Sequence, residues 1–185
     1  MAEFPERKIS VVDTRRCTVL HGYMVLQACF MDEAGASHDD IVSTLSAMTE
    51  DYFVLISVDS LEYLRKGGRL GKAGALAGSI LNIKPLIGLK DGELMPYSKV
   101  RGKKNAIAEI IKGMAKHAGD NKDDYVAISF TSDIPEDCNI IAEGLVSCGF
   151  KTVYKWNIGP VVGAHIGPTA FAAVVLKKYP GQVQF

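Results

Sequence analysis

The apolar run YFVLISV, at residues 52–58, constrains the fold more than any other segment of the chain. Its length suits a single strand, and apolar and polar positions do not alternate within it, so both of its faces must be buried. Strands of this kind occur in sheets that carry helices on both sides, of which parallel sheets are the usual example. We therefore expect an α/β fold whose sheet is covered on both faces.

The residues that precede this strand predict too few strands for a complete sheet. Residues 8–12 (KISVV) predict a short strand, and residues 23–31 are apolar almost all round, which predicts a buried helix. Ser37 and Asp40 form a capping-box-like start of a second helix. An average sheet has about five or six strands. Either these strands extend the sheet of the following residues, or a missing segment or another subunit supplies their neighbours. The apolar face of the second helix would hold Ile41, Val42, Leu45 and Met48.

The second part of the chain, residues 58–185, predicts an α/β domain with a mixed sheet flanked by helices. A hairpin is expected over residues 84–100, because Asp91-Gly92 is a favoured two-residue turn. Elsewhere helical and strand patterns alternate. Helices are expected to end at Gly67, Gly119 and Gly149, and strands are expected at residues 125–130, 151–156 and 172–176. Ser132-Asp133 is expected to cap a helix. A further helix is expected to carry small residues on one face, at Gly74, Ala77, Gly78 and Leu81.

Composition and motifs argue against several classes of function. Lysine and arginine together number 21, as do aspartate and glutamate, so no overall field favours nucleic acid. The four cysteines lack zinc-site spacing, and the sequence has no H-E-x-x-H or G-x-S-x-G motif, so we expect neither a metal nor a catalytic residue. The N-terminal residues MAEFPERK lack the apolar region of a signal peptide, and no apolar run is long enough to span a bilayer. These features predict a cytoplasmic protein that uses no cofactor.

His165 has the most unusual surroundings of the four histidines, the stretch GPVVGAHIGPTAFAAVV. Its flanking glycines and proline predict that it lies outside regular helix, and they let a backbone or a ligand approach closely. A titratable ring in such an apolar stretch is either a structural histidine with satisfied nitrogens or a ligand contact. The residues alone leave both interpretations open.

Two segments combine glycine with basic residues. Residues 67–74, GGRLGKAG, fail the Walker pattern at two positions. Arg69 and Lys72 near a helix start would suit an anionic group, whereas a helix end followed by solvated basic residues explains the same pattern. Residues 98–109, SKVRGKKNAIAE, predict either a solvated surface or a docking surface for another protein or its phosphates.

Three long segments, in this order, resemble the DegV family of bacterial fatty-acid-binding proteins. Together they cover most of residues 57–176. Members of that family carry a fatty acid and present it to a fatty acid kinase, so the resemblance implies an acyl carrier rather than an enzyme. It also implies that residues 1–57 are the remnant of a parallel-sheet N-terminal domain and that residues 58–185 are the C-terminal lipid-binding domain. The segments are VDSLEYLRKGGRLG, LNIKPLIGLKDGELMPYSKVRGKKNA and GPVVGAHIGPTAFAAVV.

The same resemblance implies roles for individual residues. His165 matches the family histidine that contacts the carboxylate of a long-chain fatty acid. Arg69 and Arg101 match basic positions that engage the kinase and the acyl-phosphate product, a role that suits arginine because its guanidinium can grip phosphate through two hydrogen bonds. The expected lining of the apolar tunnel comprises Leu76, Ile80, Ile166 and Phe171.

The chain departs from the family pattern on its N-terminal side. Family members carry further residues before the strand that KISVV matches, and these fold most of the first domain and supply hydroxyl groups to the carboxylate. The resemblance therefore implies a C-terminal portion with weakened lipid binding and an exposed sheet edge that favours homo-oligomers. Two alternatives stay open. One is a phosphotransferase subunit similar to dihydroxyacetone kinase domains, and the other is a truncated regulatory or interaction module without lipid binding.

Overall fold

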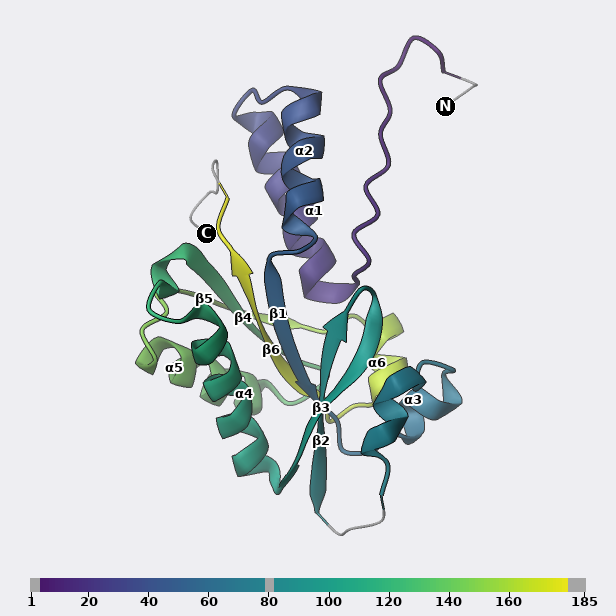
Figure 1. The fold of residues 1–185 in the computed structure, drawn as a ribbon, viewed down its shortest axis with the longest axis vertical. Coiled ribbons are helices and arrows are strands. Elements are labelled where there is room, and N and C mark those ends of the chain that lie inside the picture. The colour runs from purple at the N-terminus through teal and green to yellow at the C-terminus, as the bar shows by residue number, and fades with distance from the viewer. Residues whose placement is uncertain (1–3, 79–81, 180–185) are drawn as a thin grey trace.

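A computed structural model describes residues 4–78 and 82–179, which form one six-stranded mixed sheet with helices on both faces (Figure 1). The strand order is β3-β2-β1-β6-β4-β5. The strands are β1 (Tyr52–Ser57), β2 (Ile83–Lys90), β3 (Glu93–Arg101), β4 (Tyr125–Thr131), β5 (Thr152–Asn157) and β6 (Phe171–Lys177). The helices are α1 (Thr18–Glu33), α2 (His38–Met48), α3 (Glu62–Lys66), α4 (Lys103–Ala118), α5 (Pro135–Ser147) and α6 (Pro160–Ile166), with short 3-10 turns η1 (Gly71–Leu76) and η2 (Lys122–Asp124).

The strand predicted from the run at residues 52–58 is β1, and both of its faces are covered. Val54 packs with residues of α1, α3 and α6, whereas Leu55 packs with residues of α4 and α5 on the opposite face. The expectation of parallel neighbours was wrong for this strand, because β1 pairs antiparallel with both β2 and β6. Burial on both faces therefore comes from the helices and does not depend on strand direction. Among the described strands only β4 and β5 pair parallel.

The sheet contains residues from both parts into which the sequence was divided. β1 lies between β2 and β6, so residues 52–57 share one sheet with the strands that follow residue 58. Of the two alternatives for the first part, extension of the later sheet is the one observed for β1. A division into domains at residue 57 stays a prediction.

The strand predicted over residues 8–12 was wrong. These residues are neither helix nor strand, and Val11 is 83% exposed. A lone extended segment needs a neighbour for its backbone hydrogen bonds, and no described strand pairs with this one. In Figure 1 this segment runs away from the body of the molecule, while α1 and α2 lie together and extend past one end of the sheet. The helix expected over residues 23–31 is present in α1, but it is buried on one side only, since Val25 is 49% exposed.

Several local signals were confirmed. The Ser37 hydroxyl accepts a hydrogen bond from the Asp40 backbone N–H (3.2 Å) at the start of α2. The β2–β3 hairpin turns at Asp91 and Gly92, whose φ angles of 52° and 79° fit the two-residue turn that Asp-Gly favours. Gly119, with φ 58°, follows the last residue of α4.

Two local predictions were wrong. The small-residue segment forms only η1, which ends at Leu76, so Ala77 and Gly78 lie outside it, and Leu81 lies outside the described residues. The expected cap at Ser132-Asp133 does not form, because α5 begins at Pro135 without a side-chain cap. The Ser132 hydroxyl instead donates to the Gly167 carbonyl (2.7 Å), which ties the β4–α5 turn to the α6–β6 turn.

Acidification is expected to destabilise the fold through His117. This ring stacks on Phe53 (centroids 5.0 Å apart, planes at 10°), and the partial loss of solvent lowers its pKa from the ordinary value. Between that lowered pKa and about 6.5 the unfolded chain binds more protons than the folded chain, so stability falls as the pH drops through this window. Urea midpoints at about pH 5.5 and 7.5 should differ less in His117→Gln than in the wild type. An equal difference in both proteins would assign the pH dependence to other groups.

Candidate functional site

A mostly apolar cavity of about 310 Å³ lies on the face of the sheet that α1, α3 and α6 cover. Its volume is at the lower end of the range of roughly 300–1,000 Å³ that is typical of small-molecule sites. Strands β1 to β4 form one wall and the three helices form the others. The apolar lining comprises Leu20, Val54, Ile56, Leu64, Leu89, Leu94, Phe130, Val161, Val162 and Ile166.

His165 lies in the last turn of α6 and lines this cavity. The prediction that its glycine and proline neighbours exclude a regular helix was therefore wrong. Pro160 occupies the first turn, where a proline has no backbone hydrogen bond to break. Gly167, with φ 89°, follows the last helical residue, as glycine commonly does at a helix end. The flanking glycine and proline thus mark the ends of a short helix.

The imidazole of His165 packs directly against the backbone of Gly67, at the end of α3. A Cβ atom at position 67 would lie 2.1 Å from Nδ1, far inside van der Waals contact. Gly67 itself has an ordinary helical φ of −76°, so space and not backbone conformation requires glycine there. The Nδ1 atom is buried and has no hydrogen-bond partner among the described residues. A buried polar atom without a partner is uncommon and marks this ring as a candidate ligand contact.

Arg69 lines the same cavity and is exposed to solvent. Its Nη1 donates to the carbonyl of Gly67 (2.9 Å), so Gly67 lies between the guanidinium and the imidazole. The arrangement places a permanent cation and a titratable ring beside an apolar cavity. A ligand with one anionic end and an apolar body matches these surroundings, because the anion can take hydrogen bonds from Arg69 while the body displaces water from the cavity.

The other residues expected at the site are distributed differently. Ile166 lines the cavity. Leu76 is half-buried and packs against the same core, but it is not part of the lining. Phe171 is fully buried in the core on the opposite face of the sheet, with α4 and α5. Ile80 lies outside the described residues. Arg101, the last residue of β3, is exposed and does not line the cavity.

Sequence reasoning missed part of the cavity wall. Cys17 and Thr18, at the start of α1, line the cavity, as do residues beside the β2–β3 turn. Thr18 has a φ of 53°, which is rare for a β-branched residue and brings a hydroxyl to this wall under backbone strain. No local motif predicts these contacts, because they depend on how α1 and the β2–β3 hairpin pack together.

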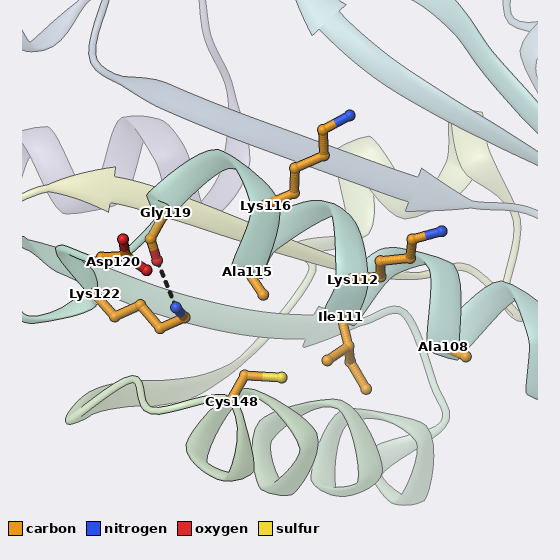
Figure 2. Close-up of a pocket in the computed structure, with 9 residues that line it drawn as sticks. All are labelled: Ala108, Ile111, Lys112, Ala115, Lys116, Gly119, Asp120, Lys122 and Cys148. Carbon is orange, nitrogen blue, oxygen red and sulfur yellow. Dashed lines mark hydrogen bonds between the residues drawn. The ribbon is translucent and has the colours of Figure 1, made fainter.

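A larger, open hollow lies between α4 and α5, with a volume of about 690 Å³ (Figure 2). Ile111 and Cys148 form its apolar floor, whereas Figure 2 shows that Lys112 and Lys116 point away from Cys148. The Lys122 ammonium donates to the Gly119 carbonyl. None of the expected site residues lines this hollow, and it lacks the converging polar groups of a small-molecule site.

Within residues 4–78 and 82–179, no cluster of three or more His, Cys, Asp or Glu side chains could hold a metal ion. No helix in the same ranges is both long and apolar enough to cross a bilayer.

The family model described as "Uncharacterised protein, DegV family" matches residues 1–178. A DegV domain-containing protein of Streptococcus pyogenes serotype M3 is 33% identical over 178 residues, which cover 94% of this chain and 60% of that protein. One from Caldanaerobacter subterraneus subsp. tengcongensis is 37% identical over 166 residues, which cover 89% of this chain and 59% of the relative. The chain thus spans about 60% of the length of the curated relatives it matches.

Solved structures with the same fold include relatives that are described as fatty-acid-binding. A structure described as fatty acid binding of a DegV family protein from Thermus thermophilus is 31% identical, with a TM-score of 0.88 over 96% of this chain and 63% of that chain. A fat acid (stearic acid)-binding protein from Eubacterium ventriosum is 26% identical, with a TM-score of 0.85 over 98% of this chain and 63% of the other.

Proposed function

The chain belongs to the DegV family, and from that premise we propose that it binds a long-chain fatty acid whose carboxylate lies beside His165 and Arg69. The observation that carries the proposal is the half-buried imidazole of His165, near the Arg69 guanidinium, at the wall of an apolar cavity. Fatty acid binding by the relatives from Thermus thermophilus and Eubacterium ventriosum supports it.

The chemistry of the cavity fits the two ends of such a ligand. A neutral or protonated imidazole can donate to a carboxylate from a ring nitrogen that faces the cavity, and the Arg69 guanidinium supplies a second, charged donor. The acyl chain would follow the apolar wall toward Leu89 and Leu94, beside the hairpin turn. Each methylene buried there contributes about 0.8 kcal/mol. Thr18 adds a hydroxyl to the same cavity.

The carrier role extends the proposal to a second protein. Arg69 and Arg101 are both exposed, as residues that contact a partner must be, and only Gly102 separates Arg101 from α4, which begins with Lys103 and Lys104. We place the contact with a fatty acid kinase, and with the phosphate of its product, at these basic residues. In this role the chain catalyses no reaction, needs no cofactor and works in the cytoplasm. The outer edge of β5 is the proposed site of self-association, because β5 pairs with β4 alone among the described strands.

Mass spectrometry of lipid extracted from the purified chain tests the proposal. A long-chain fatty acid is expected in the wild type, and fluorescence titration with a labelled fatty acid should give about tenfold weaker binding for His165→Ala, since roughly one hydrogen bond is lost. Val146→Ala is the control, because Val146 is 58% exposed on α5 and does not line the cavity. Equal affinity of His165→Ala and the wild type would remove His165 from the site.

The phosphotransferase alternative has weaker support. Lys72, one of the two cations that motivated it, pairs with Glu93 (2.5 Å) and does not line the cavity. The segment around Lys72 forms a six-residue 3-10 turn, which offers a poor N-terminus for binding phosphate. Calorimetry with ATP distinguishes the two functions, because the carrier is expected to bind no nucleotide. Absence of both ligands would favour a regulatory module without lipid binding.

A further inference from the structure

A separate, polar cavity of about 210 Å³ lies near the first residue of β1, at the end of this strand opposite Ser57. Three segments that are distant in sequence form it. They are Arg15-Arg16 before α1, the turn from Thr49 to Tyr52, and the hairpin tip from Leu89 to Gly92. Leu89 and Gly92 also line the apolar cavity, whereas His165, Arg69 and Arg101 do not line this one.

Arg16 is held rigidly in the wall of this cavity. Its guanidinium carbon lies 3.7 Å from the centre of the Tyr52 ring, and its Nη1 donates to the Met48 carbonyl (2.9 Å). The Nε atom is buried and has no hydrogen-bond partner among the described residues. Burial also lowers the pKa of Arg16 from its ordinary value, which reflects a cation that has lost part of its hydration. An arginine already fixed on two sides loses little entropy when the remaining edge of its fork binds an oxyanion.

Two further cations line the cavity. Arg15 has a φ of 51°, and its backbone packs 3.5 Å from the position that a Cβ on Gly92 would occupy, so the segment is pressed against the hairpin tip. Its side chain is 3.9 Å from Asp91, too far for a strong pair. Lys90 is exposed, and none of the described ion pairs includes it.

The charges that line the cavity leave a positive excess. Arg15, Arg16 and Lys90 supply three positive charges, and Glu50 and Asp91 supply two negative ones, so the excess is one. The volume is below the range of roughly 300–1,000 Å³ that drug-sized ligands fill. A small anionic group fits both the charge and the space.

We propose that this cavity is a binding site for a phosphate group, held by the guanidinium of Arg16 together with Lys90 and Arg15. The phosphate could belong to a free anion or to a lipid headgroup, since both present the same oxygens to the guanidinium. This inference does not rest on fatty acid binding, because the charged residues that would hold the phosphate do not line the apolar cavity, although Leu89 and Gly92 line both.

Titration with inorganic phosphate, followed by backbone amide NMR at constant ionic strength with chloride as the reference anion, tests the site. Saturable shifts are expected at Glu50, Asp91 and Gly92, which line the cavity. Arg16→Lys should weaken binding about tenfold, because a lysine keeps the charge but not the planar fork. Lys90→Gln, at an exposed position that folding does not require, should weaken it about two- to fivefold.

Two matched variants sharpen the test. Asp91→Asn removes a competing carboxylate and should tighten phosphate binding about two- to fivefold. Lys112→Gln, an exposed lysine of α4 that lies outside this cavity, should leave binding unchanged. Cosedimentation with vesicles that contain phosphatidic acid measures binding to a lipid headgroup. The ligand is a lipid headgroup if the chain binds these vesicles more tightly than free phosphate and if that binding requires Arg16 and Lys90. The proposal is overturned if neither phosphate nor these vesicles bind more tightly to the wild type than to Arg16→Lys and Lys90→Gln.

Discussion

Replacing Gly67 with alanine is expected to weaken fatty acid binding by up to about a hundredfold, with little loss of stability. The new Cβ would lie 2.1 Å from Nδ1 of His165, so the imidazole has to leave its position. The carbonyl of the same residue accepts the hydrogen bond from Arg69, and a shift there would disturb both polar contacts with the carboxylate. Because φ at Gly67 is −76°, alanine fits the backbone, and the effect should concentrate on the site.

Gly159→Ala is the control for this substitution. Gly159 has a φ of −63°, precedes α6, and a Cβ there would meet nothing within 4 Å, so alanine should leave His165 in place. Fatty acid affinity from fluorescence titration and the urea midpoint should be measured for both variants. Wild-type affinity in Gly67→Ala would show that the position of the His165 ring does not determine binding.

Replacing Phe130 with alanine is expected to lower the free energy of unfolding by about 3–5 kcal/mol. The Phe130 ring is 1% exposed and lies on β4 between the sheet and the helices of the cavity face. Alanine would leave an apolar void that these helices can fill only by losing contacts elsewhere, and the cost grows with the void that remains. Urea denaturation followed by circular dichroism measures the change.

Val161→Ala is the matched comparison, since Val161 lines the same cavity but is 76% exposed. Its effect should stay within about 0.5 kcal/mol, as for most surface substitutions. A loss below about 1 kcal/mol in Phe130→Ala would mean that the helices of this face collapse onto the sheet and refill the space.

Much of the sheet was predictable because local patterns specify it. The run at residues 52–58 is apolar on both faces and forms β1, which is buried on both faces. Asp91-Gly92 forms the turn of the β2–β3 hairpin. Residues 8–12 carried a similar strand pattern but had no neighbour to pair with. A hydropathy pattern indicates which side chains prefer burial. A strand also needs a neighbouring strand that pairs with its backbone, and the residues that form this neighbour lie elsewhere in the chain.

The candidate site was harder to predict. Local residues left His165 open between a structural and a binding role, and the family resemblance selected the binding role. Its contact with Gly67 joins α3 and α6, about a hundred positions apart, through packing that no periodicity encodes. Phe171, which was expected in the tunnel lining, lies in the core of the opposite face, because alternate residues of a strand face opposite sides of the sheet.

The central position of β6 determines when the sheet can form during synthesis. β6 joins β1 to β4, yet the ribosome makes it after the other five described strands. Until then no strand joins β1 to β4 by backbone hydrogen bonds, and the apolar edge of β1 stays open to pairing with other chains. The nascent polypeptide therefore exposes aggregation-prone surface from the synthesis of β1 until residue 171 emerges, and molecular chaperones can act on it throughout that interval.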